Sequence, residues 1–126
     1  MPMYQCFTPE GALDDEQRSS IATAFTDIHC SLTTAPRTFV HVLFHERQAP
    51  FTDSGYAIHG GIRAGRPADV TEGLVSQMTI ALAEAAGVAP SAVAMTTAET
   101  PASWIMEGGS VLPEPGEEAA WEAAHA

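Results

Sequence analysis

The stretch PMYQCFT, at residues 2–8, decides the fold, because it predicts a β-strand that is followed by a helix and a second strand. Asp14 and Gln17 have the spacing of a capping box, which predicts a helix over residues 14–33. Its apolar residues have helical spacing: Ile21, Phe25, Ile28 and Leu32. Residues 38–46, TFVHVLFHE, are rich in β-branched and aromatic side chains and predict a second, mostly buried strand.

The second half of the chain repeats this order of elements. YAIHGGI, at residues 56–62, predicts a third strand, and a second helix is expected over residues 67–86. Pro67 suits the first turn of that helix, and Gly87 suits its end. The apolar stripe of the helix is Val70, Leu74, Met78 and Leu82. SAVAMTTA, at residues 91–98, predicts the fourth strand.

Two β-α-β halves offset by about 54 residues form a weak internal repeat within one domain, residues 1–126. The halves span about residues 2–50 and 55–100 and are followed by a C-terminal tail. We therefore expect an α+β fold, with a four-stranded mixed sheet and two helices on one face. The other sheet face is left uncovered, and self-association is a natural way to cover it. The tail predicts either a short helix docked by Trp121 or a frayed end.

Composition excludes several classes of function. The formal net charge of −11 opposes binding to nucleic acid. All five cationic residues are arginine, so neither a lysine Schiff base nor a lysine-containing phosphate loop is possible. No apolar run is long enough to cross a membrane and no signal peptide is recognisable, so a cytoplasmic protein without a membrane partner is expected. Cys6 and Cys30 show no motif spacing and are expected to be buried, reduced thiols.

The position of Pro2 directly after Met1 allows two interpretations. Proline is tolerated at the first residue of a strand, so Pro2 could simply start one. Alternatively, removal of Met1 would leave a free secondary amine at the start of the mature chain. Such an amine is a titratable base that no internal residue can supply.

Four further residues could contribute to chemistry. Arg63 and Arg66 lie in the predicted turn before the second helix, where they favour either a carboxylate site or a solvated surface pair. His29 lies at the edge of the apolar stripe of the first helix, which by itself favours a partly buried structural histidine. Glu107 follows three apolar residues, so it is either a solvated turn residue or a desolvated carboxylate that can act as a base.

A metal site is not expected. His41 and His45 lie on a predicted strand, where their spacing places them about 13 Å apart, too far to share one ion. No other motif in the sequence calls for a cofactor, and none is expected.

Together these features resemble the tautomerase superfamily, and within it the branch of cis-3-chloroacrylic acid dehalogenase. The resemblance rests on Pro2 with Tyr4, on TDIHCSLT around His29, on RAGRPAD at residues 63–69 and on PASWIMEGGSVLPEPG at residues 101–116. It implies two β-α-β units per chain in a homotrimer, and a small carboxylate as the substrate.

The resemblance also assigns roles to residues. It implies that Pro2 is the acid or base, that Arg63 and Arg66 grip the substrate carboxylate, that His29 assists binding and catalysis, and that Glu107 activates water. Thr96 would line the substrate site, where the dehalogenase has a tyrosine that works beside the glutamate on water. Because threonine is a far poorer proton donor than tyrosine, this difference disfavours efficient dehalogenation.

Three functions are consistent with the sequence. Keto-enol tautomerisation of short 2-oxo or α,β-unsaturated carboxylates is the favoured one. Hydrolytic dehalogenation or hydration of cis-3-haloacrylate-type acids is the alternative that the same site would allow. The third is a trimeric binding protein on the same fold without catalysis.

Overall fold

The computed structural model describes residues 1–126 and contains a four-stranded sheet, a small hairpin and three α-helices. The strands of the main sheet are β1 (Met3–Thr8), β2 (His41–Glu46), β3 (Tyr56–Arg63) and β4 (Val93–Thr100). The hairpin consists of β5 (Met106–Glu107) and β6 (Ser110–Val111). The helices are α1 (Asp15–Leu32), α2 (Ala68–Ala86) and α3 (Glu118–Ala124).

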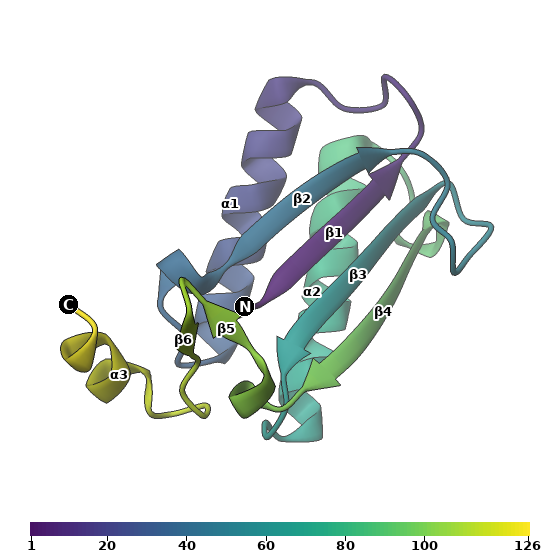
Figure 1. Cartoon of the computed structure of the whole chain (residues 1–126). Coiled ribbons are helices and arrows are strands. Elements are labelled where there is room, and N and C mark those ends of the chain that lie inside the picture. The colour runs from purple at the N-terminus through teal and green to yellow at the C-terminus, as the bar shows by residue number, and fades with distance from the viewer.

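The main sheet is mixed and has the order β2-β1-β3-β4. Each half of the chain contributes one parallel pair, β1 with β2 and β3 with β4, and the central pair β1 with β3 is antiparallel. Helices α1 and α2 both lie behind the sheet in Figure 1, and the other face carries no helix. The predicted α+β fold is therefore confirmed, including the two β-α-β units and the helices on one face.

The core lies between the sheet and the two long helices. Tyr4 and Cys6 of β1 are fully buried there, as are Ile58 and Ile62 of β3. The helices contribute Ile21, Phe25, Leu74, Met78 and Leu82, so both predicted stripes face the sheet. Burial of these side chains supplies most of the driving force for folding, at about 25 cal/mol per Å² of apolar surface.

The capping and glycine signals in the sequence correctly predict where the two long helices begin and end. The predicted capping box forms: the backbone N–H of Gln17 donates to the Asp14 carboxylate, and the Gln17 side chain accepts from the Asp14 N–H, both at 2.8 Å. Gly87 takes the left-handed conformation (φ 71°) and ends α2, as expected for a glycine at that position.

The second strand departs from the sequence prediction. Residues Arg37–Phe39 form a 3₁₀ turn, so β2 begins only at His41. The strand is also not mostly buried, because its alternate residues His41 and Leu43 point to the face without helices. That prediction was wrong because a run of apolar residues does not show whether both faces of a strand are covered.

The last part of the chain differs from the sequence prediction in detail. A 3₁₀ turn at Pro90–Ala92 moves β4 two residues beyond the predicted start. The β5–β6 hairpin, which turns at Gly108 and Gly109, was not predicted from the sequence. Of the two outcomes predicted for the tail, the docked helix is observed. Trp121 of α3 packs edge-on against Phe39, and its indole N–H donates to the Val111 carbonyl at 2.7 Å. None of the helices combines the length and apolar character that crossing a membrane requires.

Candidate active site

The N-terminus lies beside the β5–β6 hairpin (Figure 1). The Met1 amine is 2.7 Å from a carboxylate oxygen of Glu107, and Nε2 of His41 is 3.1 Å from the same oxygen. Pro2 is fully buried, and its carbonyl accepts a hydrogen bond from the His41 N–H at 3.0 Å. The hairpin thus holds the Glu107 carboxylate next to the first residues of the chain.

Two opposing effects act on Glu107. Burial raises the pKa of its carboxyl. The hydrogen bonds and charges of the N-terminal amine and His41 lower this pKa by more than burial raises it, so the net shift is downward. The Glu107 side chain is 30% exposed, which lets water reach it. With Met1 in place, Glu107 is therefore an ionised partner of the amine rather than a desolvated base.

His29 is buried within the core rather than at its edge. The Tyr4 hydroxyl lies 2.6 Å from Nδ1 of His29 and has no other partner. Burial, then the charges of Arg66, Arg63 and the N-terminal amine, lower the pKa of His29 to about 3. Burial also raises the pKa of Tyr4, so its hydroxyl stays protonated. Because this hydroxyl has no other acceptor, we assign it as the donor to Nδ1 of His29. His29 is therefore neutral and carries its proton on Nε2, which is buried without a partner.

Arg66 provides a second unpaired donor. Its Nη1 donates to the Arg63 carbonyl at 3.3 Å, whereas its Nη2 is buried and has no partner. The side chain lies above the C-terminal end of α1, where a shallow cavity of about 270 Å³ is bordered by Arg66, by Thr33 and Thr34, and by Gly116 of the tail. Burial and the charge of Arg63 lower the pKa of Arg66, but an arginine stays protonated at any physiological pH.

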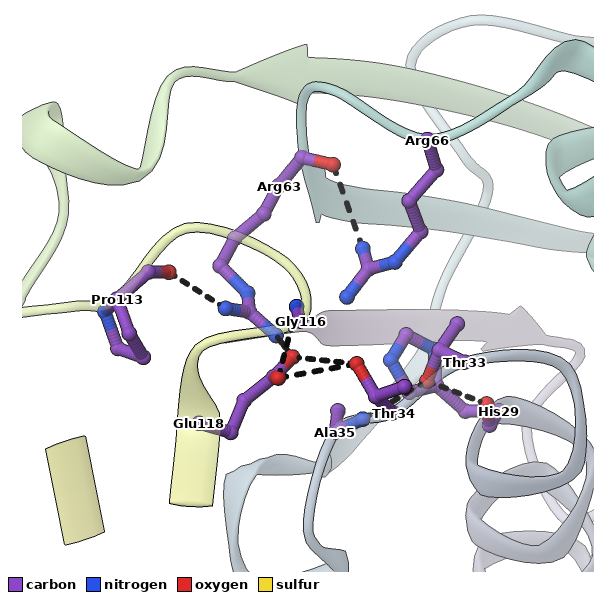
Figure 2. Close-up of polar contacts among 9 residues, drawn as sticks. All are labelled: His29, Thr33, Thr34, Ala35, Arg63, Arg66, Pro113, Gly116 and Glu118. Carbon is purple, nitrogen blue, oxygen red and sulfur yellow. Dashed lines mark hydrogen bonds and ion pairs between the residues drawn. The ribbon is translucent and has the colours of Figure 1, made fainter. Parts of the chain in front are cut away.

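Arg63 has quite different surroundings, which Figure 2 shows. Its Nη1 donates to the Pro113 carbonyl at 2.6 Å, and its Nη2 donates to the Glu118 carboxylate at 2.9 Å. The guanidinium also lies 5.5 Å from the centre of the Phe39 ring. Arg63 is thus not a solvated surface residue, and its charge is already balanced by the tail.

Thr96 is not brought to this group of residues. It is exposed on the sheet face without helices, where its hydroxyl lies 2.8 Å from Nδ1 of His59. Strand register places it opposite His59 and at the level of Gln5, two strands from β1. Strand geometry separates its backbone from that of Pro2 by roughly 14 Å.

Three contributors were not expected from the sequence. Tyr4 was noted only as part of a motif, His41 was interpreted as an ordinary sheet residue, and Glu118 was not singled out. A tyrosine two residues after Pro2 gave a signal for the first. Nothing local could reveal the Arg63–Glu118 pair, because 55 residues separate its members. No group of three or more His, Cys, Asp or Glu side chains is placed to hold a metal ion.

The comparisons with known proteins agree with this architecture. Residues 1–125 match the family Tautomerase_3, described as "Putative oxalocrotonate tautomerase enzyme". The crystal structure of N1, a member of the cis-3-chloroacrylic acid dehalogenase family, is 32% identical with a TM-score of 0.88, over 96% of this chain and 90% of that one. Native Ps01740 is 38% identical with a TM-score of 0.75, over 83% and 99%. The comparison with curated proteins finds no match.

More distant structures share the fold. Pt0534 inactivated by 2-oxo-3-pentynoate is 18% identical with a TM-score of 0.75, over 87% of this chain and 94% of that one. The chain therefore belongs to the tautomerase superfamily, in the branch that contains the cis-3-chloroacrylic acid dehalogenase family. This membership indicates an enzyme and agrees with the resemblance inferred from the sequence.

Proposed function

We propose that the protein is a tautomerase that acts on small 2-oxo or α,β-unsaturated carboxylates, with Pro2 as its acid or base. The observation that carries this proposal is the set of three buried nitrogens without hydrogen-bond partners, Nε2 of His29, Nη2 of Arg66 and Nε of Arg63. Leaving such groups unpaired costs about 1–3 kcal/mol each, more where the group is charged, which a bound acceptor would offset. A carboxylate offers two acceptor oxygens, and the full charge of Arg66 favours an anion.

The catalytic role of Pro2 requires removal of Met1. The Met1 side chain packs at the edge of a small cluster formed by Phe39, Ile105 and Leu112. Its removal would expose the nitrogen of Pro2 as a secondary amine and free Glu107 from its present partner. An α-amino group ordinarily titrates near about 7.7–8.0, and burial together with nearby arginines disfavours its charged form. Pro2 would then be a neutral base near neutral pH.

The proposed reaction moves protons only. In a substrate such as enol phenylpyruvate, one proton leaves the enol hydroxyl and one is added to C3, which yields the ketone without a redox partner. Pro2 takes the first proton and returns a proton to the carbon. His29 and Arg66 bind the carboxylate, together with Arg63, whose carbonyl accepts a hydrogen bond from Arg66.

Hydration or dehalogenation is the second candidate, and the position of Glu107 favours it. If Pro2 were protonated, it could donate to C2 while Glu107 directs water to C3. N1, from the dehalogenase family, is the precedent among similar structures. Thr96 argues against it, because it cannot replace a tyrosine as a proton donor. A binding protein without catalysis would keep the carboxylate site but show no dependence on Pro2.

We further propose that the chain forms a homotrimer. The sheet face without helices carries apolar residues such as Leu43, which is 47% exposed. A fused 4-OT structure described as an asymmetric trimer shares the fold, at 18% identity over 86% of this chain and 94% of that one, with a TM-score of 0.75.

The direct test combines N-terminal mass spectrometry with an assay of enol phenylpyruvate. We expect the purified protein to begin at Pro2, and Pro2→Ala to lower kcat by about 10²-fold or more, the usual contribution of a general acid or base. Ile80→Ala on the outer side of α2 is the control, with activity like that of the parent. Full activity in a chain that retains Met1 would rule out the proposed role of Pro2.

A further inference from the structure

His41 lies at the start of the edge strand β2, directly beside the first residues of the chain. In the parallel pair of β1 with β2 it is opposite Met3, and its backbone N–H donates to the Pro2 carbonyl at 3.0 Å. Its side chain is 49% exposed, on the sheet face without helices. None of these backbone contacts involves Met1, so the removal of Met1 leaves them in place.

The side chain of His41 also contacts the β5–β6 hairpin, which lies next to the N-terminus in Figure 1. Its Nε2 is 3.1 Å from Oε1 of Glu107, the same oxygen that the Met1 amine contacts at 2.7 Å. These two groups are the hydrogen-bond partners of the Glu107 carboxylate, and its Oε2 has none. Once Met1 is removed, His41 is the one that remains of the two.

The contact between His41 and Glu107 has a defined direction. An ionised carboxylate only accepts hydrogen bonds, so Nε2 of His41 carries a proton and donates to Oε1. Burial raises the pKa of Glu107, and the N-terminal amine and His41, the two titratable groups that act on it, lower this pKa by more. After processing, His41 continues to favour the ionised form, while Oε2 stays free to face the terminal amine.

A fixed anion beside the terminal amine assists the proposed proton transfer. The Met1 amine is in contact with Glu107, and the nitrogen of Pro2 is the next one along the chain. Neutral Pro2 takes the enol proton and becomes a secondary ammonium, which then gives a proton to C3 and is neutral again. A carboxylate held next to this ammonium stabilises it by charge attraction where water is partly excluded. His41 and Glu107 end each turnover unchanged.

We propose that His41 is a positioning residue that holds the Glu107 carboxylate ionised and next to the processed N-terminus, so that Glu107 stabilises protonated Pro2 during turnover. This inference rests on the proposed function, because it concerns the same proton transfer. His41 lies outside the group of residues that binds the substrate carboxylate, so it acts through Glu107. It should therefore affect kcat rather than KM.

Removal of the imidazole, and its replacement by another donor, test this role. In His41→Leu the donor is lost, so we expect kcat for enol phenylpyruvate to fall by about tenfold while KM changes by less than about twofold. His41→Gln provides an amide N–H at a similar distance from the backbone and should keep kcat within about threefold of the parent. Glu107→Gln should lose at least as much kcat as His41→Leu, because it removes the anion itself.

The pH dependence separates positioning from a merely structural effect. Without His41 the pKa of Glu107 rises, so the carboxylate takes up a proton at higher pH, and kcat declines earlier on acidification in His41→Leu than in the parent. The titration of Glu107 can be followed directly by ¹³C NMR of side-chain carboxyls in the N-terminally processed protein, with Glu107→Gln for assignment. Its midpoint should lie at higher pH in His41→Leu.

His45→Leu is the matched control. His45 lies four residues further along the same strand and on the same face, and its Nε2 contacts Gln5 at 2.9 Å rather than Glu107. Any effect of an added apolar residue on the open face or on assembly is therefore shared by the two leucine variants. We expect His45→Leu to keep the kcat, the KM and the Glu107 midpoint of the parent.

Three results would overturn the proposal. These are an equal midpoint of Glu107 in His41→Leu and the parent, a loss of kcat in His41→Gln as large as that in His41→Leu, and full activity in Glu107→Gln. A parent that begins at Pro2 but does not convert enol phenylpyruvate would instead overturn the proposed function. The Glu107 midpoint would then decide by itself whether His41 holds the carboxylate.

Discussion

At the scale of single residues, the hydrogen bond between Tyr4 and His29 determines what the site can donate. A histidine with an ordinary pKa near 6.5 would gain charge in the acidic range, whereas burial and the positive charges around His29 hold its pKa at about 3. With Nδ1 accepting from Tyr4, the proton of the ring is on Nε2. His29 therefore acts as a neutral donor over the whole physiological range of pH.

Replacing Tyr4 by Phe tests this arrangement. The variant leaves Nδ1 of His29 buried without a donor, so we expect a loss of about 1–3 kcal/mol in the free energy of unfolding. The tautomer is then no longer fixed, and KM for enol phenylpyruvate should rise more than kcat falls. Tyr56→Phe is the matched control, because no hydrogen bond of the Tyr56 hydroxyl is present. Ring ¹⁵N shifts and urea unfolding would measure both effects, and equal results for the two variants would contradict the assignment.

The same pKa shift predicts how stability depends on pH. His29 binds a proton near pH 6.5 in the unfolded chain but only near pH 3 in the folded one. The unfolded state thus binds more protons between these values, so the stability that His29 contributes is complete above pH 6.5 and is lost as pH falls toward 3. In His29→Gln this part of the pH dependence should be absent. Urea unfolding at several pH values would show it, and parallel curves for parent and variant would count against a neutral, buried His29.

At the scale of elements, the sequence predicted what depends on neighbours along the chain. Both long helices end within one residue of their predicted limits, because a capping box and a terminal glycine act locally. The β5–β6 hairpin is local, and the positive φ of Gly108 and Gly109 in its turn explains the Gly-Gly pair, which was not used in the sequence prediction. The place of Glu118 depends on contacts between distant segments, and no local pattern encodes it. For the same reason Arg63 and Arg66 appeared equivalent in the sequence, although folding pairs only Arg63 with a carboxylate.

Strand β4 gives the test that separates tautomerisation from dehalogenation. Thr96 lies on the open sheet face, so it can reach a site only if another copy of the chain covers that face. We expect the parent to convert enol phenylpyruvate and to release chloride from cis-3-chloroacrylate slowly or not at all. Thr96→Tyr should raise chloride release by about tenfold while changing ketone formation less, because it adds a proton donor.

Thr97→Tyr is the control for that experiment, since the neighbouring side chain points to the opposite face of the strand. Ketone formation and chloride would be followed separately at several pH values. Fast chloride release by the parent that does not change in Thr96→Tyr would instead make dehalogenation the main activity.

At the scale of the whole molecule, the single chain covers only one face of its sheet. Helices α1 and α2 bury the core side, while the other side exposes Leu43 and the polar pairs Gln5–His45 and His59–Thr96. The hairpin region adds further exposed apolar side chains, Trp104, Met106 and Val111. Exposed apolar surface of this kind marks an interaction site, and the proposed homotrimer would cover it.

Leu43→Glu tests that assembly, because it places a charge on the open face, at the edge strand β2. Leu43 is 47% exposed in the single chain, and Ile80 on α2 is 43% exposed, so the two residues offer equal apolar surface on opposite layers. Burial of a leucine contributes about 1.5–3 kcal/mol, and burying a charge instead opposes association. In sedimentation velocity we expect the parent and Ile80→Glu to be trimers, and Leu43→Glu to be monomeric at the same concentration. A parent that sediments as a monomer, or a trimer that withstands Leu43→Glu but not Ile80→Glu, would show that the open sheet face is not the interface.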